Sequence, residues 1–183
     1  MSIPCKMRPV GGGLPTGYKR VEYLESTGTQ YIDTEYVPNN ETGIYLYQLK
    51  TKTGDYIPMG CRNGVVSGTR FYALRSSYDD NRMDTGYGWG TWRPLNTIRG
   101  RQKTKLNYLN SRKAEGEGET QGLGELGFEP NQPIYMFAAN IEGVPSLLWS
   151  GRIYEAVISQ GESTAMSFVP CLDPEGAPCM FDM

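Results

Sequence analysis

The chain has 183 residues, and its 18 Lys and Arg and 20 Asp and Glu give a formal net charge of −2 at pH 7. This length is enough to bury one hydrophobic core. The weakly acidic balance argues against a nucleic-acid partner, because phosphate backbones are bound by clustered positive charge. No stretch approaches the roughly 20 apolar residues of a membrane span, so membrane insertion is not expected.

The first 17 residues differ in composition from the rest. They contain Gly11–Gly13 together with Pro4, Pro9 and Pro15, a composition typical of flexible segments. We therefore expect residues 1–17 to form a flexible N-terminal arm that acts as a tether, and residues 18–183 to form one domain. The N-terminus also lacks the apolar core of a secretory signal, which predicts a chain made in the cytoplasm.

From Tyr18 onward, short runs rich in Tyr, Ile, Val and Thr alternate with clusters of Gly, Pro, Asn and Asp. No segment sustains an apolar period of 3.6 residues, so the sequence predicts an all-β fold. Residues 43–49 and 134–139 are apolar or aromatic at nearly every position, as expected for strands between stacked sheets. The expected strands are 18–25, 29–34, 43–50, 55–60, 65–76, 84–93, 96–99, 102–109, 133–140, 146–159 and 165–171.

The four cysteines have no C-x-x-C spacing, and the chain contains no histidine. A structural zinc site is therefore not expected. Cys171 and Cys179 flank Asp173–Gly176, a turn signal, so a hairpin would bring them opposite each other. Two free thiols in a reducing cytoplasm are the favoured interpretation, and a disulfide is the alternative.

The sequence offers one arrangement for catalysis. Glu115, Glu117 and Glu119 alternate as carboxylates do on one face of a strand, and two such groups could serve retaining glycoside hydrolysis. However, Gly116 and Gly118 lie between them, and glycines would leave the carboxylates in a mobile, solvated loop over 114–124 without fixed geometry. Without histidine, a Ser-His-Asp or Cys-His arrangement is also missing. The sequence therefore predicts a protein that is not an enzyme.

An oxygen-ligand site for calcium is a minor alternative. Asp79, Asp80, Asn81 and Asp84 could ligate the ion, although an EF-hand spacing is missing. An ordinary polar turn is the favoured interpretation, and no cofactor is expected.

The aromatic stretch Tyr87–Arg93 is the best binding candidate. Trp89 is flanked by glycines, so its ring would be poorly covered, and it and Trp92 could stack on the apolar face of a sugar beside Tyr87. Arg93 could then hydrogen-bond hydroxyl groups, and Arg62 is a further candidate. The alternative is structural: strand alternation would place Trp89 in the core and Trp92 on a sheet surface, with Arg62 bracing a loop.

The opening hairpin 18–34 resembles the start of laminin-G-like, concanavalin A-like jelly-roll domains found in proteins of gut bacteria and their phages. Further landmarks follow in the order typical of that family, and together they cover nearly the whole chain after residue 14. The resemblance implies a sandwich of two antiparallel sheets. These landmarks are 60–62, 71–72, 135–140, 151–154 and 168–182.

This scaffold serves many functions, so the function has to be argued from sites. The leading hypothesis is a non-catalytic display or adhesion module, a phage virion or surface component that binds carbohydrate on a cell surface and contacts other virion proteins through the arm. A second hypothesis is a structural capsid or tail decoration protein that self-associates as a homo-oligomer. The third is a glycan hydrolase.

A virion protein would be made in the cytoplasm and displayed outside the cell later. Relatives usually continue past the last landmark, so the end at Met183 is either a truncation or a natural stop.

Overall fold

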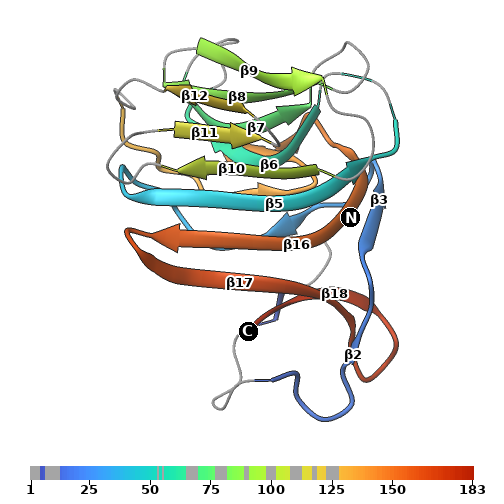
Figure 1. The fold of residues 1–183 in the computed structure, drawn as a ribbon. Coiled ribbons are helices and arrows are strands. Elements are labelled where there is room, and N and C mark those ends of the chain that lie inside the picture. The colour runs from blue at the N-terminus through green and yellow to red at the C-terminus, as the bar shows by residue number, and fades with distance from the viewer. Residues whose placement is uncertain are drawn as a thin grey trace.

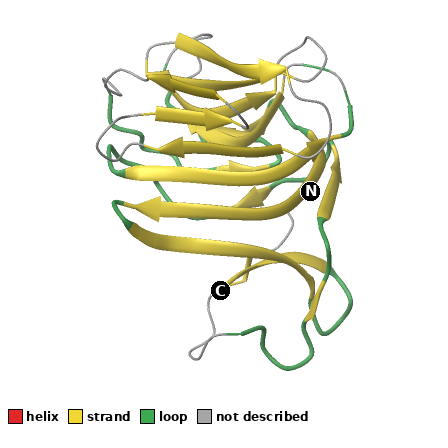
Figure 2. Ribbon diagram, viewed as in Figure 1, coloured by secondary structure: helices red, strands yellow, loops and turns green. Residues whose placement is uncertain are grey.

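The computed structural model describes residues 5–6, 13–52, 54, 56–64, 70–76, 82–88, 91–97, 102–107, 113–116, 119–122 and 128–183. Every regular element in these residues is a strand, and Figure 2 shows strands joined by loops. This confirms the predicted all-β class. The strands are β1 (Cys5–Lys6), β2 (Lys19–Arg20), β3 (Leu24–Thr27), β4 (Ile32–Asp33), β5 (Thr42–Lys50), β6 (Tyr56–Arg62), β7 (Phe71–Ser76), β8 (Arg82–Gly88), β9 (Thr91–Thr97), β10 (Gln102–Asn107), β11 (Lys113–Gly116), β12 (Glu119–Gly122), β13 (Tyr135–Met136), β14 (Ala139–Ile141), β15 (Val144–Ser146), β16 (Ser150–Gln160), β17 (Ser163–Leu172) and β18 (Pro178–Asp182).

The strands form two sheets, and the first contains ten of them. Its order is β1-β18-β17-β16-β5-β10-β11-β12, with β2 paired to β17 and β3 paired to β16. The long strands β5, β16 and β17 run side by side across the molecule (Figure 1). All pairings in this sheet are antiparallel except the short pair between β1 and β18.

The second sheet contains eight strands in the order β15-β14-β6-β7-β8-β9, with β13 joined to β6 and β4 joined to β13. Its pairings are also antiparallel, apart from that between β14 and β6. The two sheets give the predicted antiparallel β-sandwich.

The hydrophobic core joins the two sheets. Trp149 is fully buried, and its ring stacks on that of Phe137 at 6.0 Å between centroids. Burial of such large rings supplies much of the stabilisation of a β-sandwich. The other members of the main cluster are Leu24, Ile32, Ile44, Leu46, Met59, Cys61, Tyr72, Leu74, Ile134, Met136, Ile153, Ala156, Ile158, Phe168 and Met180.

Strand β5 shows how alternation fixes the faces of the first sheet. Ile44 and Leu46 are fully buried toward the core, whereas Tyr45 and Tyr47 between them are half-buried on the other face. This is the period of two expected for a strand with one covered face. The expectation that both faces of 43–49 are buried between sheets is therefore wrong for the tyrosines. Residues 134–139 are all buried as predicted, but the expected strand 133–140 is interrupted, because β13 ends at Met136 and β14 begins at Ala139.

One expected strand is two strands. Residues 84–93 were predicted to run as a single strand, but β8 ends at Gly88, β9 begins at Thr91, and Tyr87 pairs with Thr91. The chain therefore reverses between them.

The predicted mobile loop over 114–124 contains the hairpin β11–β12 instead. Strand β11 also pairs with β10, which is bonded to β5 on its other side. The backbone groups along the free side of β10 need partners, and the Gly- and Glu-rich segment supplies them despite its low strand propensity. Tertiary pairing thus decided the structure of this segment.

Part of the expected N-terminal arm has a described position. Cys5 and Lys6 pair with Met180 and Phe181 of β18, and Leu14 packs against the cluster that contains Phe181. Residues 7–12 lie outside the described residues, so the flexibility of the arm stays a prediction. In the described part of the chain, no helix has the length and apolar character needed to cross a bilayer.

Candidate functional site

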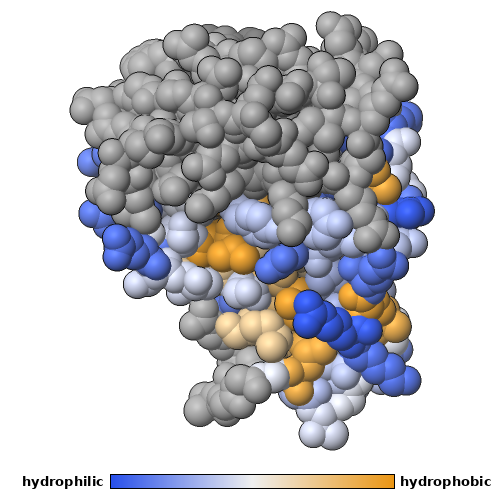
Figure 3. Space-filling view, in the orientation of Figure 1, coloured by the Kyte–Doolittle hydropathy of each residue, from blue (hydrophilic) through white to orange (hydrophobic). Residues whose placement is uncertain are grey.

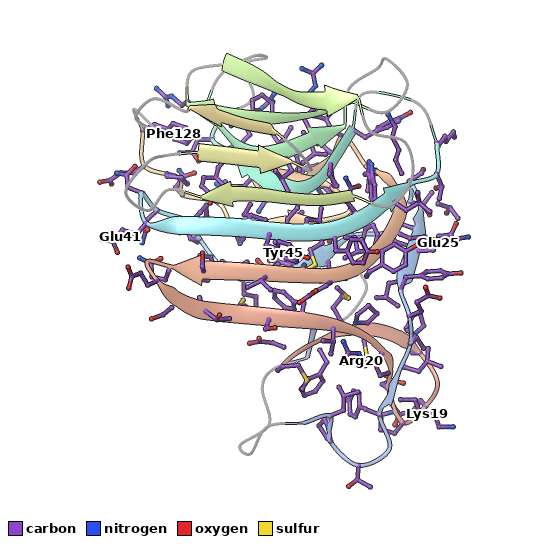
Figure 4. All side chains as sticks on the ribbon, viewed as in Figure 1. Lys19, Arg20, Glu25, Glu41, Tyr45 and Phe128 are labelled. Atoms are coloured by element: carbon purple, nitrogen blue, oxygen red, sulfur yellow. The ribbon has the colours of Figure 1, made fainter. Side chains whose placement is uncertain are left out.

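Four tyrosines gather on the outer face of the ten-stranded sheet, the face turned away from the core. They are Tyr23, Tyr45, Tyr47 and Tyr154, here called the tyrosine face. The ring of Tyr154 lies between two of the others, with centroids 4.9 Å from Tyr47 and 5.6 Å from Tyr23. Figure 4 marks Tyr45 on this side of the sheet.

A β-bulge in β16 places Glu155 beside Tyr154 on this face. Ile153 pairs with Gln48 and Glu155 pairs with Tyr47, so Tyr154 is the extra residue between the two register positions. Without the bulge, strict alternation would put Ile153 and Glu155 on the same face. With it, Ile153 stays in the core while Tyr154 and Glu155 both lie on the outer side. Bulges are a common means of re-aiming a side chain beside a functional site.

An ion pair borders the tyrosine face at β3. Arg152 Nε donates a hydrogen bond to Glu25 Oε2 at 2.8 Å, and the two side chains are 34% and 38% exposed. The guanidinium carbon of Arg152 lies 4.5 Å from the ring centroid of Tyr23, a cation–π arrangement. The hydrogen bond to Glu25 raises the pKa of Arg152, and it fixes the guanidinium beside the rings.

A carboxylate lies on the other side of the rings. Burial raises the pKa of Tyr45, and the charges of Glu155 and then Tyr47 add to the effect. Glu155 is therefore close enough to Tyr45 for their charges to interact. In backbone register, Lys103 and Lys105 of β10 lie opposite Tyr47 and Tyr45. The tyrosine face thus combines aromatic rings with hydrogen-bonding groups of both signs.

Such a surface has a definite chemistry. Half-buried rings present flat apolar faces at little cost in side-chain entropy. Arg152, Glu25 and Glu155 offer donors and acceptors at the rim of the rings. The arrangement can therefore bind a ligand that has both an apolar ring face and several hydroxyl groups. Figure 3 shows this side of the molecule, where hydrophobic and hydrophilic patches alternate over the described residues.

The residues predicted from the aromatic stretch lie on the other sheet. Trp89 and all the side chains of β8 and β9 lie outside the described residues, so only the backbone register of Tyr87, Trp92 and Arg93 is known. Tyr87 pairs with the buried Tyr72, Trp92 pairs with Gly86, and Arg93 pairs with Thr85. The proposal that they bind a ligand stays a prediction.

Arg62 lies at the end of β6 on the same sheet, two strands away from Gly88 through Phe71. Its side chain is largely buried, its Nε donates to the carbonyl of Gly64 at 3.0 Å, and its guanidinium carbon lies 5.1 Å from the Phe71 ring centroid. Burial lowers its pKa. These contacts brace the turn after β6 through a backbone carbonyl, and a ligand-binding role for Arg62 stays a prediction.

The glutamates considered for hydrolysis are not aligned along one strand. Glu115 lies on β11 and pairs with Thr120, whereas Glu119 lies on β12 and pairs with Gly116. Because 115 and 116 alternate in face, these pairings put Glu115 and Glu119 at register positions of opposite faces of the hairpin. The expected cluster on a single face is therefore wrong for these two residues, and Glu117 lies outside the described residues.

Asp79, Asp80 and Asn81 lie outside the described residues too, as does the side chain of Asp84, so the calcium alternative stays untested. Among the residues that the structure does describe, no three carboxylate or thiol groups gather closely enough to hold a metal ion.

Sequence reasoning did not single out the tyrosine face. Tyr45 and Tyr47 carried a signal, because two tyrosines two residues apart define one face of a strand. No sequence signal pointed to their partners Tyr23 and Tyr154. No local pattern predicts that β3 and a bulge of β16 come together beside β5.

The comparisons with known proteins bear on the fold. No family model matches the chain, and no curated protein sequence matches it either. The fold itself is a two-sheet antiparallel β-sandwich. One solved structure that it resembles is the Ruminococcus gnavus IT-sialidase CBM40 bound to α2,3-sialyllactose, with a TM-score of 0.53 and 14% identity over 77% of this chain and 90% of that one.

Another similar structure is the K499G mutant of NanB sialidase from Streptococcus pneumoniae, with a TM-score of 0.58 and 9% identity. The match covers 78% of this chain, which spans only 26% of the NanB chain. At these identities the likeness establishes a shared fold, which is the β-sandwich expected from the sequence.

Proposed function

We propose that this chain is a non-catalytic carbohydrate-binding module that holds a glycan on the tyrosine face. The observation that carries the proposal is the packing of Tyr154 between Tyr23 and Tyr47 on the outer side of the sheet, with ring centroids 5.6 Å and 4.9 Å away. The buried ring of Tyr154 holds the two more exposed rings in place, and the bulge of β16 puts Glu155 on the same side. Bulges are common beside functional sites, which favours a binding role. The fold shared with a CBM40 module supports the same role.

The binding would follow from the chemistry of the face. The rings of Tyr47 and Tyr23 would stack on the C–H face of a sugar, and Arg152 and Glu155 would hydrogen-bond its hydroxyl groups. Neighbouring rings and the Glu25 hydrogen bond already hold these groups in place. Little conformational entropy would then be lost on binding.

The biological setting that we propose is display. The landmarks along the chain support membership of the laminin-G-like family of gut bacteria and phages, and a virion or surface component would meet glycans on a cell surface. The arm of residues 1–17 would join the domain to other virion proteins after synthesis in the cytoplasm. The register of Glu115 and Glu119 supports a role without hydrolysis.

A glycan array with the purified full chain tests the proposal, with light scattering on the same sample. Three alanine variants separate the sites. Tyr47→Ala removes the centre of the tyrosine face, and Trp92→Ala removes the candidate from the aromatic stretch. Tyr31→Ala is the matched control, because Tyr31 is also half-buried and stacked on one ring, that of Tyr135 at 4.9 Å, in the other sheet.

Binding that is lost in Tyr47→Ala alone would establish the tyrosine face as the site. Loss in Trp92→Ala alone would overturn that assignment and move the site to the aromatic stretch. A blank array with a defined oligomer would contradict glycan binding altogether and favour the self-associating decoration protein.

A further inference from the structure

Two cysteines face each other near the C-terminal end of the chain. Cys171 of β17 and Cys179 of β18 are direct register partners, and their Sγ atoms are 3.0 Å apart. Both side chains are fully buried. Facing residues on antiparallel strands have Cα atoms about 4.5–5.5 Å apart, which lies within the range that disulfides span. A bond between the sulfurs would therefore need no shift of either strand.

The hairpin that carries them is rigid by its own hydrogen bonds. Asp173 Oδ1 accepts from the backbone N–H of Glu175 at 3.1 Å and of Ala177 at 2.8 Å. The N–H of Asp173 also donates to the carbonyl of Ala177 at 2.9 Å. These bonds fix the turn between the cysteines, so the two sulfurs are held together rather than meeting by chance.

The other two cysteines lie elsewhere in the fold. Cys61 belongs to the main core on β6, whereas Cys171 and Cys179 form a separate cluster with Val169 and Phe181. Cys5 lies on β1 with its backbone in register with Met180. It is thus a neighbour in the sheet but not the register partner of either member of the pair.

We propose that Cys171 and Cys179 form an intrachain disulfide that staples β18 to β17 when the protein is in oxidising surroundings. The two thiols lose two protons and two electrons as one S–S bond forms. A small-molecule disulfide, or the disulfide of an oxidoreductase, accepts the electrons and is cleaved to two thiols by way of a mixed disulfide. The favoured expectation of two free thiols then applies only to the chain in a reducing compartment.

Two features govern when the bond forms. Burial, and then the neighbouring Cys179, raise the pKa of Cys171 to about 12, and only the thiolate attacks a disulfide. The folded hairpin therefore reacts slowly, and oxidation proceeds while β18 is still docking or when it opens. The same burial protects the finished bond from reductants. The disulfide closes a loop between residues eight apart in sequence. It secures β18, whose other neighbour in the sheet is the two-residue strand β1.

Peptide mapping tests the bond directly in the unaltered full chain. No Lys or Arg follows Arg152, so trypsin leaves residues 153–183 as one peptide that contains both cysteines and neither Cys5 nor Cys61. The protein is equilibrated with oxidised glutathione through a cycle of unfolding and refolding, alkylated in denaturant and digested. The expected peptide is two hydrogen atoms lighter than the reduced form and takes up alkyl groups only after reduction. A peptide alkylated twice, or one cross-linked to the fragment that contains Cys5, would overturn the proposal.

Thermal unfolding gives a second measurement. Oxidation is expected to raise the Tm of the natural sequence by roughly 5–10 °C, because the link restricts the unfolded chain. The double variant Cys171→Ala/Cys179→Ala should lose this response, and Cys5→Ser, the matched control, should keep it. An equal shift in the double variant would contradict the staple. Neither measurement involves a glycan, so this proposal stands or falls separately from the proposed function.

Discussion

The ring of Tyr154 lies 4.9 Å from the ring of Tyr47, at the point where β16 carries one extra residue in its pairing with β5. Only 7% of Tyr154 is exposed, since Tyr47 and Tyr23 cover it from two sides. The residue is thus on the outer face of the sheet yet packed like a core residue. It supports the more exposed rings of Tyr47 and Tyr23 from below.

Truncation of this central ring should be costly for stability. We expect Tyr154→Ala to lower the free energy of unfolding by about 3 kcal/mol, because it removes a largely buried ring and two aromatic contacts. Tyr154→Phe should retain most of that stability. Urea unfolding followed by tryptophan fluorescence gives both values. An alanine variant as stable as the natural sequence would show that the packing around the bulge carries little energy.

The ion pair beside the rings should matter for binding more than for folding. Glu25→Gln removes the charged acceptor of Arg152, but exposed pairs contribute little to stability, so the unfolding midpoint should change little. Affinity for any glycan bound on the tyrosine face should fall several-fold, because Arg152 loses its fixed orientation. Calorimetric titration measures the affinity, with Glu162→Gln in the exposed β16–β17 turn as the control. Equal affinity in both variants would exclude a part for the pair in binding.

Stability should fall with rising pH above about 10. Tyr45 and Tyr135 both have a pKa raised above the ordinary tyrosine value, chiefly by burial. At a pH between that ordinary value and the raised one, the unfolded chain loses these protons while the folded chain keeps them. The unfolded state is then favoured, so this stabilisation is complete below pH about 10 and is lost as the pH climbs through the folded pKa.

The charge of Glu155 offers a specific check on this pH dependence. Glu155→Gln removes one of the causes that raise the pKa of Tyr45, so one tyrosine should ionise at lower pH than in the natural sequence. Titration of tyrosinate absorbance in the folded protein measures the shift. An unchanged titration curve would mean that the carboxylate does not act on Tyr45.

A close approach between β6 and β7 should make Gly60 intolerant of substitution. A Cβ at this position would lie 2.3 Å from Ala73 Cβ and 2.6 Å from the Tyr72 carbonyl oxygen. Gly60→Ala should therefore cost about 3 kcal/mol of stability through overpacking. Gly143→Ala is the comparison: its site is open but its φ is +80°, so it should cost about 1 kcal/mol from backbone strain alone. Equal costs measured by urea unfolding would argue against steric exclusion at Gly60.

The sequence by itself determined the features that depend on local pattern. The absence of helical periodicity predicted strands throughout, and the Asp173–Gly176 turn placed Cys171 opposite Cys179. Strand patterns and turn chemistry are short-range properties, so the all-β class could be predicted from them, whereas the two-sheet sandwich was implied by the resemblance to the laminin-G-like family. Only the tertiary structure decided the candidate site. Glu25 and Arg152 are 127 residues apart, and the bulge at Tyr154 exists only because of how β16 pairs with β5. Pairing between distant strands is set by packing of the whole core, which no local segment encodes.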